Sequence, residues 1–70
     1  MAQIKNFFLN NEKYITEDHI NLHDLIIYFD YNASLLVLEY NQVILDKNHW
    51  KTTFIKDLDE IEIVTIVGGG

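Results

Sequence analysis

The chain has no cysteine, no proline and no arginine, and its three glycines all stand at the carboxyl end. Without cysteine it can form no disulfide, no thiol nucleophile and no cysteine-based metal site. Stability must therefore come from packing, in a chain of 70 residues that is near the lower size at which one core stabilises a fold unaided. About half of the residues are apolar, at 49%, so the composition predicts one small domain.

Long apolar runs and excess positive charge are also missing. No stretch approaches the roughly 18 apolar residues that a membrane span requires. The amino-terminal segment MAQIKNFFLNNEK lacks the basic start, apolar middle and small-residue cleavage site of a secretory signal. Eleven acidic residues against five lysines give a net charge of −6, which repels phosphate backbones. We therefore expect no membrane and no nucleic acid among the partners, but a protein with a basic surface.

The first half of the chain predicts a hairpin followed by one helix. Residues 3–9, QIKNFFL, and the segment KYIT are strand-like, and the intervening NNE predicts a turn because asparagine tolerates the left-handed conformation that glycine usually supplies. From Asn21 the apolar residues recur at three- and four-residue spacing, which predicts a helix over residues 22–31. Asn21 and Asp24 are spaced as an N-cap and its reciprocal partner.

The second half predicts further strands. Residues 35–40, LLVLEY, read as a central strand that is buried on both faces. Short strands are expected at VIL and TTFI, and Asp46 is placed to cap a short helical turn between them. The polar turn KDLDE then leads into a last strand over residues 60–67.

This order of elements predicts an α+β fold, with a mixed sheet of four to five strands packed against one helix. The β-grasp fits best, because its last strand is central and its carboxyl end projects freely from the sheet. We expect a β-grasp domain over residues 1–67 and a flexible tail over residues 68–70.

The tail consists of Gly68, Gly69 and Gly70. Glycine loses the most entropy on ordering and adds no packing, so folding does not explain this segment. Extended, three residues reach about 10 Å and can enter a narrow pocket of a partner. The α-carboxylate of Gly70 is ionised at neutral pH. It can attack an activated phosphate to give an acyl-adenylate, which a sulfur or an amine can then capture. Any thiol in that reaction must come from a partner.

The carboxyl half carries a family resemblance. The segment EIEIVTIVGGG, preceded by KDLD and by LLVLEYNQVILDKNHW, resembles the ThiS family, the sulfur carriers of thiamine biosynthesis. The resemblance spans nearly the whole chain and includes the hairpin, the helix with its DLI core and the D-x-D-x-I-E-I step. One departure is Leu58, at a position often held by glycine, which leaves the turn type before the last strand open.

The resemblance implies a ubiquitin-like fold whose C-terminal Gly70 is adenylated by an E1-like adenylyltransferase (ThiF-like) and converted to a thiocarboxylate. Gly68 and Gly69 would enter the partner's active site with it. Sulfur would pass to a thiazole synthase (ThiG-like), which forms the thiazole ring of thiamine. The resemblance implies no bound cofactor, since ATP and a sulfur donor are used by the partner enzymes.

The last strand also offers a docking surface. Alternation directs Ile61, Ile63, Thr65 and Val67 to the core, and Glu62, Val64 and Ile66 to the opposite face. An apolar patch of Val64 and Ile66 beside the tail would suit a partner with a basic rim. Its acidic rim would be formed by Asp57, Asp59, Glu60 and Glu62. The alternative is that this face is covered core or ordinary surface.

Other candidate sites are weaker. His19, His23 and Asp24 lie close in sequence, but His19 precedes the helix and need not share a face with His23, so we expect no metal site. We expect His49 to accompany a turn and Trp50 to close one end of the core rather than anchor an interface. The carboxylates form no acid/base pair in a pocket, so we expect a carrier and not an enzyme, monomeric when free.

Three alternatives remain open. One is the sulfur carrier of molybdopterin synthesis, a small subunit that also ends in Gly-Gly; the short length and the D-x-D-x-I-E-I step favour the thiamine branch. The second is a ubiquitin-like modifier, with Gly70 joined to a lysine of a target. The third is an adaptor whose binding survives loss of Gly69 and Gly70. The bias toward Ile, Asn, Lys, Tyr and Phe indicates an AT-rich genome, and hence a bacterial cytoplasm or a plastid stroma.

Overall fold

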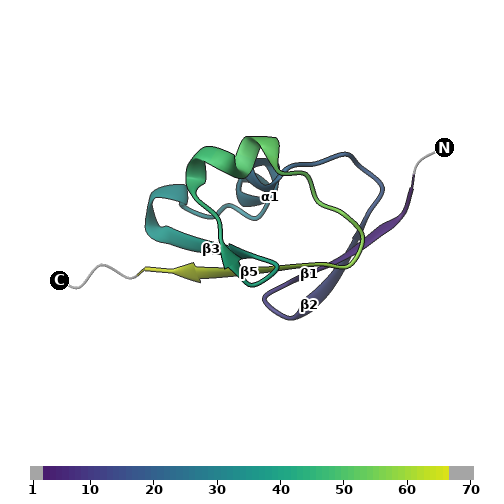
Figure 1. The fold of residues 1–70 in the computed structure, drawn as a ribbon, viewed down its shortest axis with the longest axis horizontal. Coiled ribbons are helices and arrows are strands. Elements are labelled where there is room, and N and C mark those ends of the chain that lie inside the picture. Colours follow the sequence, from purple (N-terminus) through teal and green to yellow (C-terminus); the bar gives the residue numbers. More distant parts are fainter. Residues whose placement is uncertain (1–2, 67–70) are drawn as a thin grey trace.

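The computed structural model describes residues 3–66, and these form a five-stranded mixed sheet with one α-helix (Figure 1). The order of the strands in the sheet is β2-β1-β5-β3-β4. The last strand, β5, is central: it pairs in parallel with β1 and antiparallel with β3. The predicted α+β class and the central position of the last strand are confirmed. The strands are β1 (Lys5–Leu9), β2 (Glu12–Thr16), β3 (Leu36–Tyr40), β4 (Val43–Ile44) and β5 (Asp59–Thr65).

The amino-terminal hairpin forms as predicted. β1 and β2 pair antiparallel, with Leu9 opposite Glu12 across a two-residue turn. The turn residues Asn10 and Asn11 have φ angles of 50° and 67°. Positive φ at both central positions is typical of a type I′ turn, whose twist matches that of the flanking strands. Asparagine therefore takes the place that glycine usually has in such turns.

The helix α1 (Leu22–Tyr28) begins with the predicted cap. The Asp24 amide donates to Asn21 Oδ1 at 2.8 Å, and the Asn21 amide donates to Asp24 Oδ2 at 3.1 Å. The helix ends three residues before the predicted end, because Asp30 adopts a left-handed conformation with φ 59°. The Tyr31 amide then bonds Ile26 O and the Asp30 amide bonds Ile27 O, both at 3.0 Å, which is the Schellman pattern of helix termination.

The core lies on one side of the sheet, beneath α1 and the 3₁₀ helix η2 (Lys47–Thr52), which run across the same face (Figure 1). Trp50 of η2 is buried, and its Nε1 donates to Leu45 O at 3.0 Å, so its predicted role in closing the core is confirmed. The buried apolar residues are Phe7, Leu9, Leu22, Leu25, Ile26, Leu36, Leu38, Trp50, Ile55, Ile61 and Ile63.

Three local predictions are wrong. β3 is not buried on both faces: Leu36 and Leu38 are buried, but Val37 and Glu39 are only half-buried, because no element among residues 3–66 covers the second face of the sheet. Asp46 precedes η2, but its side chain makes no capping hydrogen bond. The predicted strand TTFI is reduced to a single bridge between Phe54 and Asn21. Within the described residues, no helix has the length and apolar character needed to cross a membrane.

Candidate functional site

The strand that leads to the tail is held firmly up to its end. β5 pairs with β1 from Asp59 to Ile61 and with β3 from Ile61 to Thr65. The Ile66 amide donates to Leu35 O at 2.6 Å, where Leu35 ends the 3₁₀ turn η1 (Ala33–Leu35). Val67 and the predicted tail over residues 68–70, including Gly70, lie outside the described residues. The hydrogen bond between Ile66 and Leu35, at one end of the sheet, is therefore the last described contact before the tail.

The predicted alternation along β5 is confirmed for most of the strand. Ile61 and Ile63 are buried in the core, while Glu62 is exposed on the other face. Val64 and Ile66 expose 52% and 53% of their surface, so the expected apolar pair beside the tail is present. Thr65, which was expected to face the core, is exposed.

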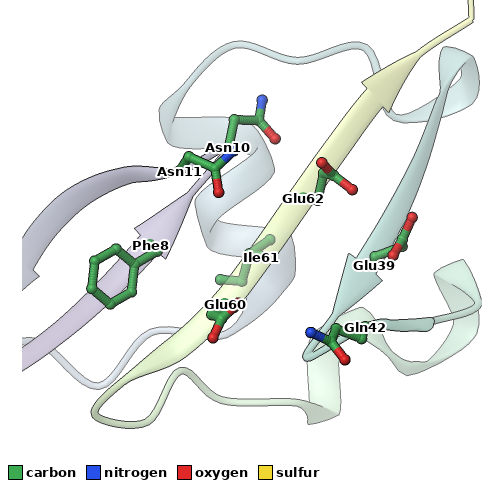
Figure 2. A pocket seen from close by; sticks show the side chains of 8 residues that line it. All are labelled: Phe8, Asn10, Asn11, Glu39, Gln42, Glu60, Ile61 and Glu62. Atoms are coloured by element: carbon green, nitrogen blue, oxygen red, sulfur yellow. The ribbon is translucent and has the colours of Figure 1, made fainter.

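The open face of the sheet extends this surface to the neighbouring strands. Val37 and Glu39 of β3 lie directly opposite Val64 and Glu62 of β5. An open hollow of about 500 Å³ lies over the sheet here (Figure 2). Three carboxylates and no cationic side chain line it, so its electrostatic character is acidic. The lining residues are Phe8, Asn10, Asn11, Glu39, Gln42, Glu60, Ile61 and Glu62.

Sequence reasoning missed Glu39 and Phe8 as members of this surface. Both belong to strands that are distant from β5 in the sequence, and the pairing register brings Glu39 opposite Glu62 and Phe8 opposite Glu60. The alternation of β3 was the available signal, since it separates Val37 and Glu39 from the buried leucines. Like charges placed directly opposite each other on a sheet are destabilising. The Glu39–Glu62 pair therefore does not serve the fold.

Asp59 does not belong to the acidic rim, which corrects the prediction for this residue. Only 6% of its surface is exposed. Its carboxylate accepts hydrogen bonds from Tyr40 Oη at 2.5 Å, Asn41 Nδ2 at 3.1 Å and the Lys56 amide at 2.7 Å. Burial, with the hydrogen bond to Asp59, raises the pKa of Tyr40 well above its ordinary value. Asp59 therefore fixes the start of β5, and the exposed acids Glu60 and Glu62 remain on the rim.

The turn before β5 retains the backbone shape of a glycine turn although Leu58 occupies the position. Leu58 has a φ of 70°, and the Asp59 amide donates to Lys56 O at 3.2 Å. A positive φ at the third residue of a four-residue turn is the requirement of a type II turn. The Asn6 amide donates to Asp57 Oδ1 at 2.8 Å, which joins the turn to β1. Leu58 thus adopts the turn conformation that glycine usually supplies at this position, and β5 begins directly after it.

His19 and His49 make contacts that belong to the fold. The His19 ring stacks on Phe54 with centroids 4.1 Å apart, and the Asp24 carboxylate is engaged by the helix cap. His49 lies in η2, where its carbonyl accepts hydrogen bonds from two threonine hydroxyls. Among residues 3–66, no group of three His, Cys, Asp or Glu side chains is placed to hold a metal ion.

Comparisons with known proteins agree with this arrangement. The sequence model of the ThiS family matches residues 1–70. A protein of Trieres chinensis named ycf40 is 59% identical over 100% of this chain and 96% of its own length. A ycf40 protein of Porphyra purpurea is 36% identical over 89% of this chain and 87% of its own.

A solved structure shows the same fold. The crystal structure of a thiamine biosynthesis protein (ThiS) from Geobacter metallireducens superposes with a TM-score of 0.78 at 24% identity, and covers 93% of this chain and 99% of that one. The predicted β-grasp fold is thereby confirmed. The match of the family model to the full chain shows the family to which the chain belongs. The chain belongs to the ThiS family of ubiquitin-like sulfur carriers.

Proposed function

We propose that the chain carries sulfur on Gly70 for formation of the thiazole ring of thiamine. The Gly70 carboxylate attacks the α-phosphorus of ATP and releases pyrophosphate, which gives an acyl-adenylate. A sulfur nucleophile at the oxidation level of sulfide then displaces AMP and leaves a thiocarboxylate. The relative from Geobacter metallireducens, named a thiamine biosynthesis protein, supports the thiamine branch over molybdopterin synthesis.

The observation that carries this proposal is the placement of β5. The strand that leads to the glycine tail is central in the sheet, and the amide of Ile66, the residue after the strand, donates a hydrogen bond to Leu35 O. A reactive terminus that follows such a strand would be presented from a rigid body while the glycines themselves add no side chains. This arrangement suits delivery of a carboxylate into the active site of another protein.

In this function the chain is a co-substrate and not an enzyme by itself. An E1-like adenylyltransferase would hold ATP and activate Gly70, and a thiazole synthase would accept the sulfur. We propose that both recognise the surface formed by Val64, Ile66, Glu60 and Glu62. The relatives named ycf40 are encoded in plastid genomes, which supports a plastid stroma as the compartment.

The test is the intact mass of the chain after incubation with ATP, a sulfur source and the activating enzyme. We expect one terminal oxygen to be replaced by sulfur, with fragmentation locating the change at Gly70. A chain that lacks Gly69 and Gly70 is the matched control and should stay unmodified. An unchanged mass with an enzyme that is active on another carrier would contradict the proposal and favour an adaptor.

The acceptor is identified by a second reaction. The thiocarboxylated chain should lose its sulfur when it is mixed with thiazole synthase and the remaining substrates of that enzyme, and keep it when mixed with the large subunit of molybdopterin synthase. The opposite result would assign the chain to the molybdopterin branch. Recovery of the chain joined through Gly70 to lysines of other proteins would instead indicate a modifier.

A further inference from the structure

The central strand β5 continues beyond the strand that flanks it. The pairing of β1 with β5 ends at Leu9 and Ile61, whereas β5 runs on to Thr65. Asn10 extends the contact slightly: its amide donates to Ile61 O at 2.9 Å, and its Oδ1 accepts from the Ile63 amide at 2.7 Å. Figure 2 shows β1 ending beside Asn10 while β5 passes it. From this point the β1 side of β5 has no neighbouring strand among residues 3–66.

The hydrogen bonds to β3 determine which backbone groups point into this open position. The Ile66 amide bonds Leu35 O, and the Asn41 amide bonds Glu60 O. Because backbone groups alternate in direction along a strand, the even-numbered residues of β5 face β3 and the odd-numbered residues face β1. The carbonyl of Ile63 and both backbone groups of Thr65 therefore point to the β1 side. Within the described part of the chain, no hydrogen bond reaches these three groups.

We propose that this free edge at Ile63 and Thr65 receives an extended segment of the E1-like adenylyltransferase when that enzyme takes the tail. That segment adds to the sheet as a short strand where β1 ends. This inference rests on the proposed function, since it requires a partner that binds the tail. A row of unpaired strand groups is a template for main-chain hydrogen bonds from another chain.

The position of the edge favours the adenylyltransferase, which binds the tail in the proposed function, as its occupant. The same strand leads from Thr65 through Ile66 into the tail, so pairing at Thr65 would orient the tail toward the partner's active site. Fixing the strand beside the tail lowers the entropy lost when the tail enters a pocket. On the open face, the added strand would lie beside Val64 and near Glu62, both exposed. An apolar or a cationic side chain of the partner suits these neighbours.

A second copy of the chain is a less suitable occupant. Each copy has a net charge of −6, which opposes association of like chains. The open edge is also short, because Asn10 bounds it on one side and the tail begins on the other. Two strands paired over so few residues have little independent stability.

Amide exchange tests the proposal directly. We expect the Thr65 amide of the free chain to exchange quickly, and at least about tenfold more slowly in a saturated complex with the E1-like adenylyltransferase, prepared without ATP. The Val64 amide is the internal control, because its N–H faces β3 and should be protected in both states. A Thr65 amide that stays unprotected in the saturated complex would overturn the proposal.

A pair of substitutions tests it by affinity. Thr65→Pro removes the N–H and Thr65→Val keeps it, and the β3 pairing is spared in both because the Thr65 N–H faces away from β3. We expect Thr65→Pro to bind the adenylyltransferase about tenfold more weakly than Thr65→Val, the loss of one hydrogen bond. If Thr65→Pro does not fold, an ester bond in place of the Thr65 amide, made by chemical synthesis, gives the same comparison.

The outcomes separate this inference from the proposed function. If Thr65→Pro and Thr65→Val bind the adenylyltransferase with equal affinity, the edge pairing is overturned. The carrier function still stands in that case if the chain without substitutions accepts sulfur. Failure of the unmodified chain to bind an active adenylyltransferase would overturn both.

Discussion

Leu58 holds a backbone conformation that costs an L-residue with a branched side chain roughly 1–2 kcal/mol. Its side chain is 65% exposed and so contributes little packing in return. We expect Leu58→Gly to raise the free energy of unfolding by about 1 kcal/mol, as measured by urea denaturation. Leu58→Ala is the control, because it removes the side chain but keeps a Cβ, and it should gain much less. An equal gain in the free energy of unfolding in both variants would show that the side chain of Leu58, and not its backbone conformation, destabilises the fold.

The hydrogen bond between Tyr40 and Asp59 predicts a dependence of stability on alkaline pH. The folded pKa of Tyr40 is raised, whereas an unfolded tyrosine titrates near about 10. The stabilisation is therefore complete below about pH 10 and is lost as the pH rises from there toward the folded pKa, at up to about 1.4 kcal/mol per pH unit.

Tyr40→Phe is the variant that isolates this effect. At neutral pH we expect it to lower the free energy of unfolding by about 2 kcal/mol, because Asp59 loses a charge-assisted partner. The difference between the two proteins should then shrink as the pH rises above about 10. A difference that stays constant to the highest pH at which both fold would contradict the assignment.

At the level of elements, the hairpin turn and the central strand depend on each other through one side chain. Asn10 and Asn11 have similar positive φ angles, but only Asn10 bonds β5, through the Ile63 amide. We expect Asn11→Gly to leave the stability unchanged or raise it by a few tenths of a kcal/mol, because Asn-Gly is the preferred type I′ pair. Asn10→Gly should lower it by about 1–2 kcal/mol, since it leaves a part-buried N–H without its partner. Thermal unfolding of the two variants is the measurement, and equal effects would show that the side-chain bond is not important.

Element boundaries show what the sequence could and could not indicate. The start of α1 was readable, because Asn21 and Asp24 form a local pattern that depends on no distant residue. Its end was not, because Asp30 occupies a left-handed position without the glycine that usually signals one. The strand alternation placed Ile61 and Ile63 correctly, since side chains in a strand alternate irrespective of its neighbours.

The candidate site was less predictable because it depends on register. Glu39 faces Glu62 only through the pairing of β3 with β5, and single-strand alternation does not specify which residues stand opposite each other. Asp59 was misplaced for a different reason. The predicted strand began at residue 60, so Asp59 was assigned to the polar turn and to the acidic rim, whereas β5 begins at Asp59. Its partner Tyr40 is distant in the sequence.

For the molecule as a whole, we expect the acidic sheet face to lower the stability of the free chain and to favour association with the proposed partner. Glu39 and Glu62 repel each other in the free chain, so Glu62→Gln should raise the free energy of unfolding by a few tenths of a kcal/mol. If the proposed adenylyltransferase binds this face with a basic surface, the same change should slow their association and weaken the dependence of the association rate on salt. Stopped-flow association at several ionic strengths measures this.

Glu17→Gln is the matched control for that experiment. It removes one exposed acidic charge after β2, away from the open hollow. It should change the association rate less than Glu62→Gln. Equal slowing by both variants would mean that the net charge, and not the sheet face, steers the partner.

The fold makes its turns from asparagine, aspartate, glutamine and leucine at positive φ, and so leaves all three glycines at the carboxyl end. If the protein is labelled with ¹⁵N at glycine alone, residues 1–67 consequently give no ¹⁵N signal. A spectrum of such a sample contains only the signals of Gly68, Gly69 and Gly70. The end that we propose to react can thus be followed by itself through the proposed activation, sulfur loading and release, inside complexes whose other signals would obscure it.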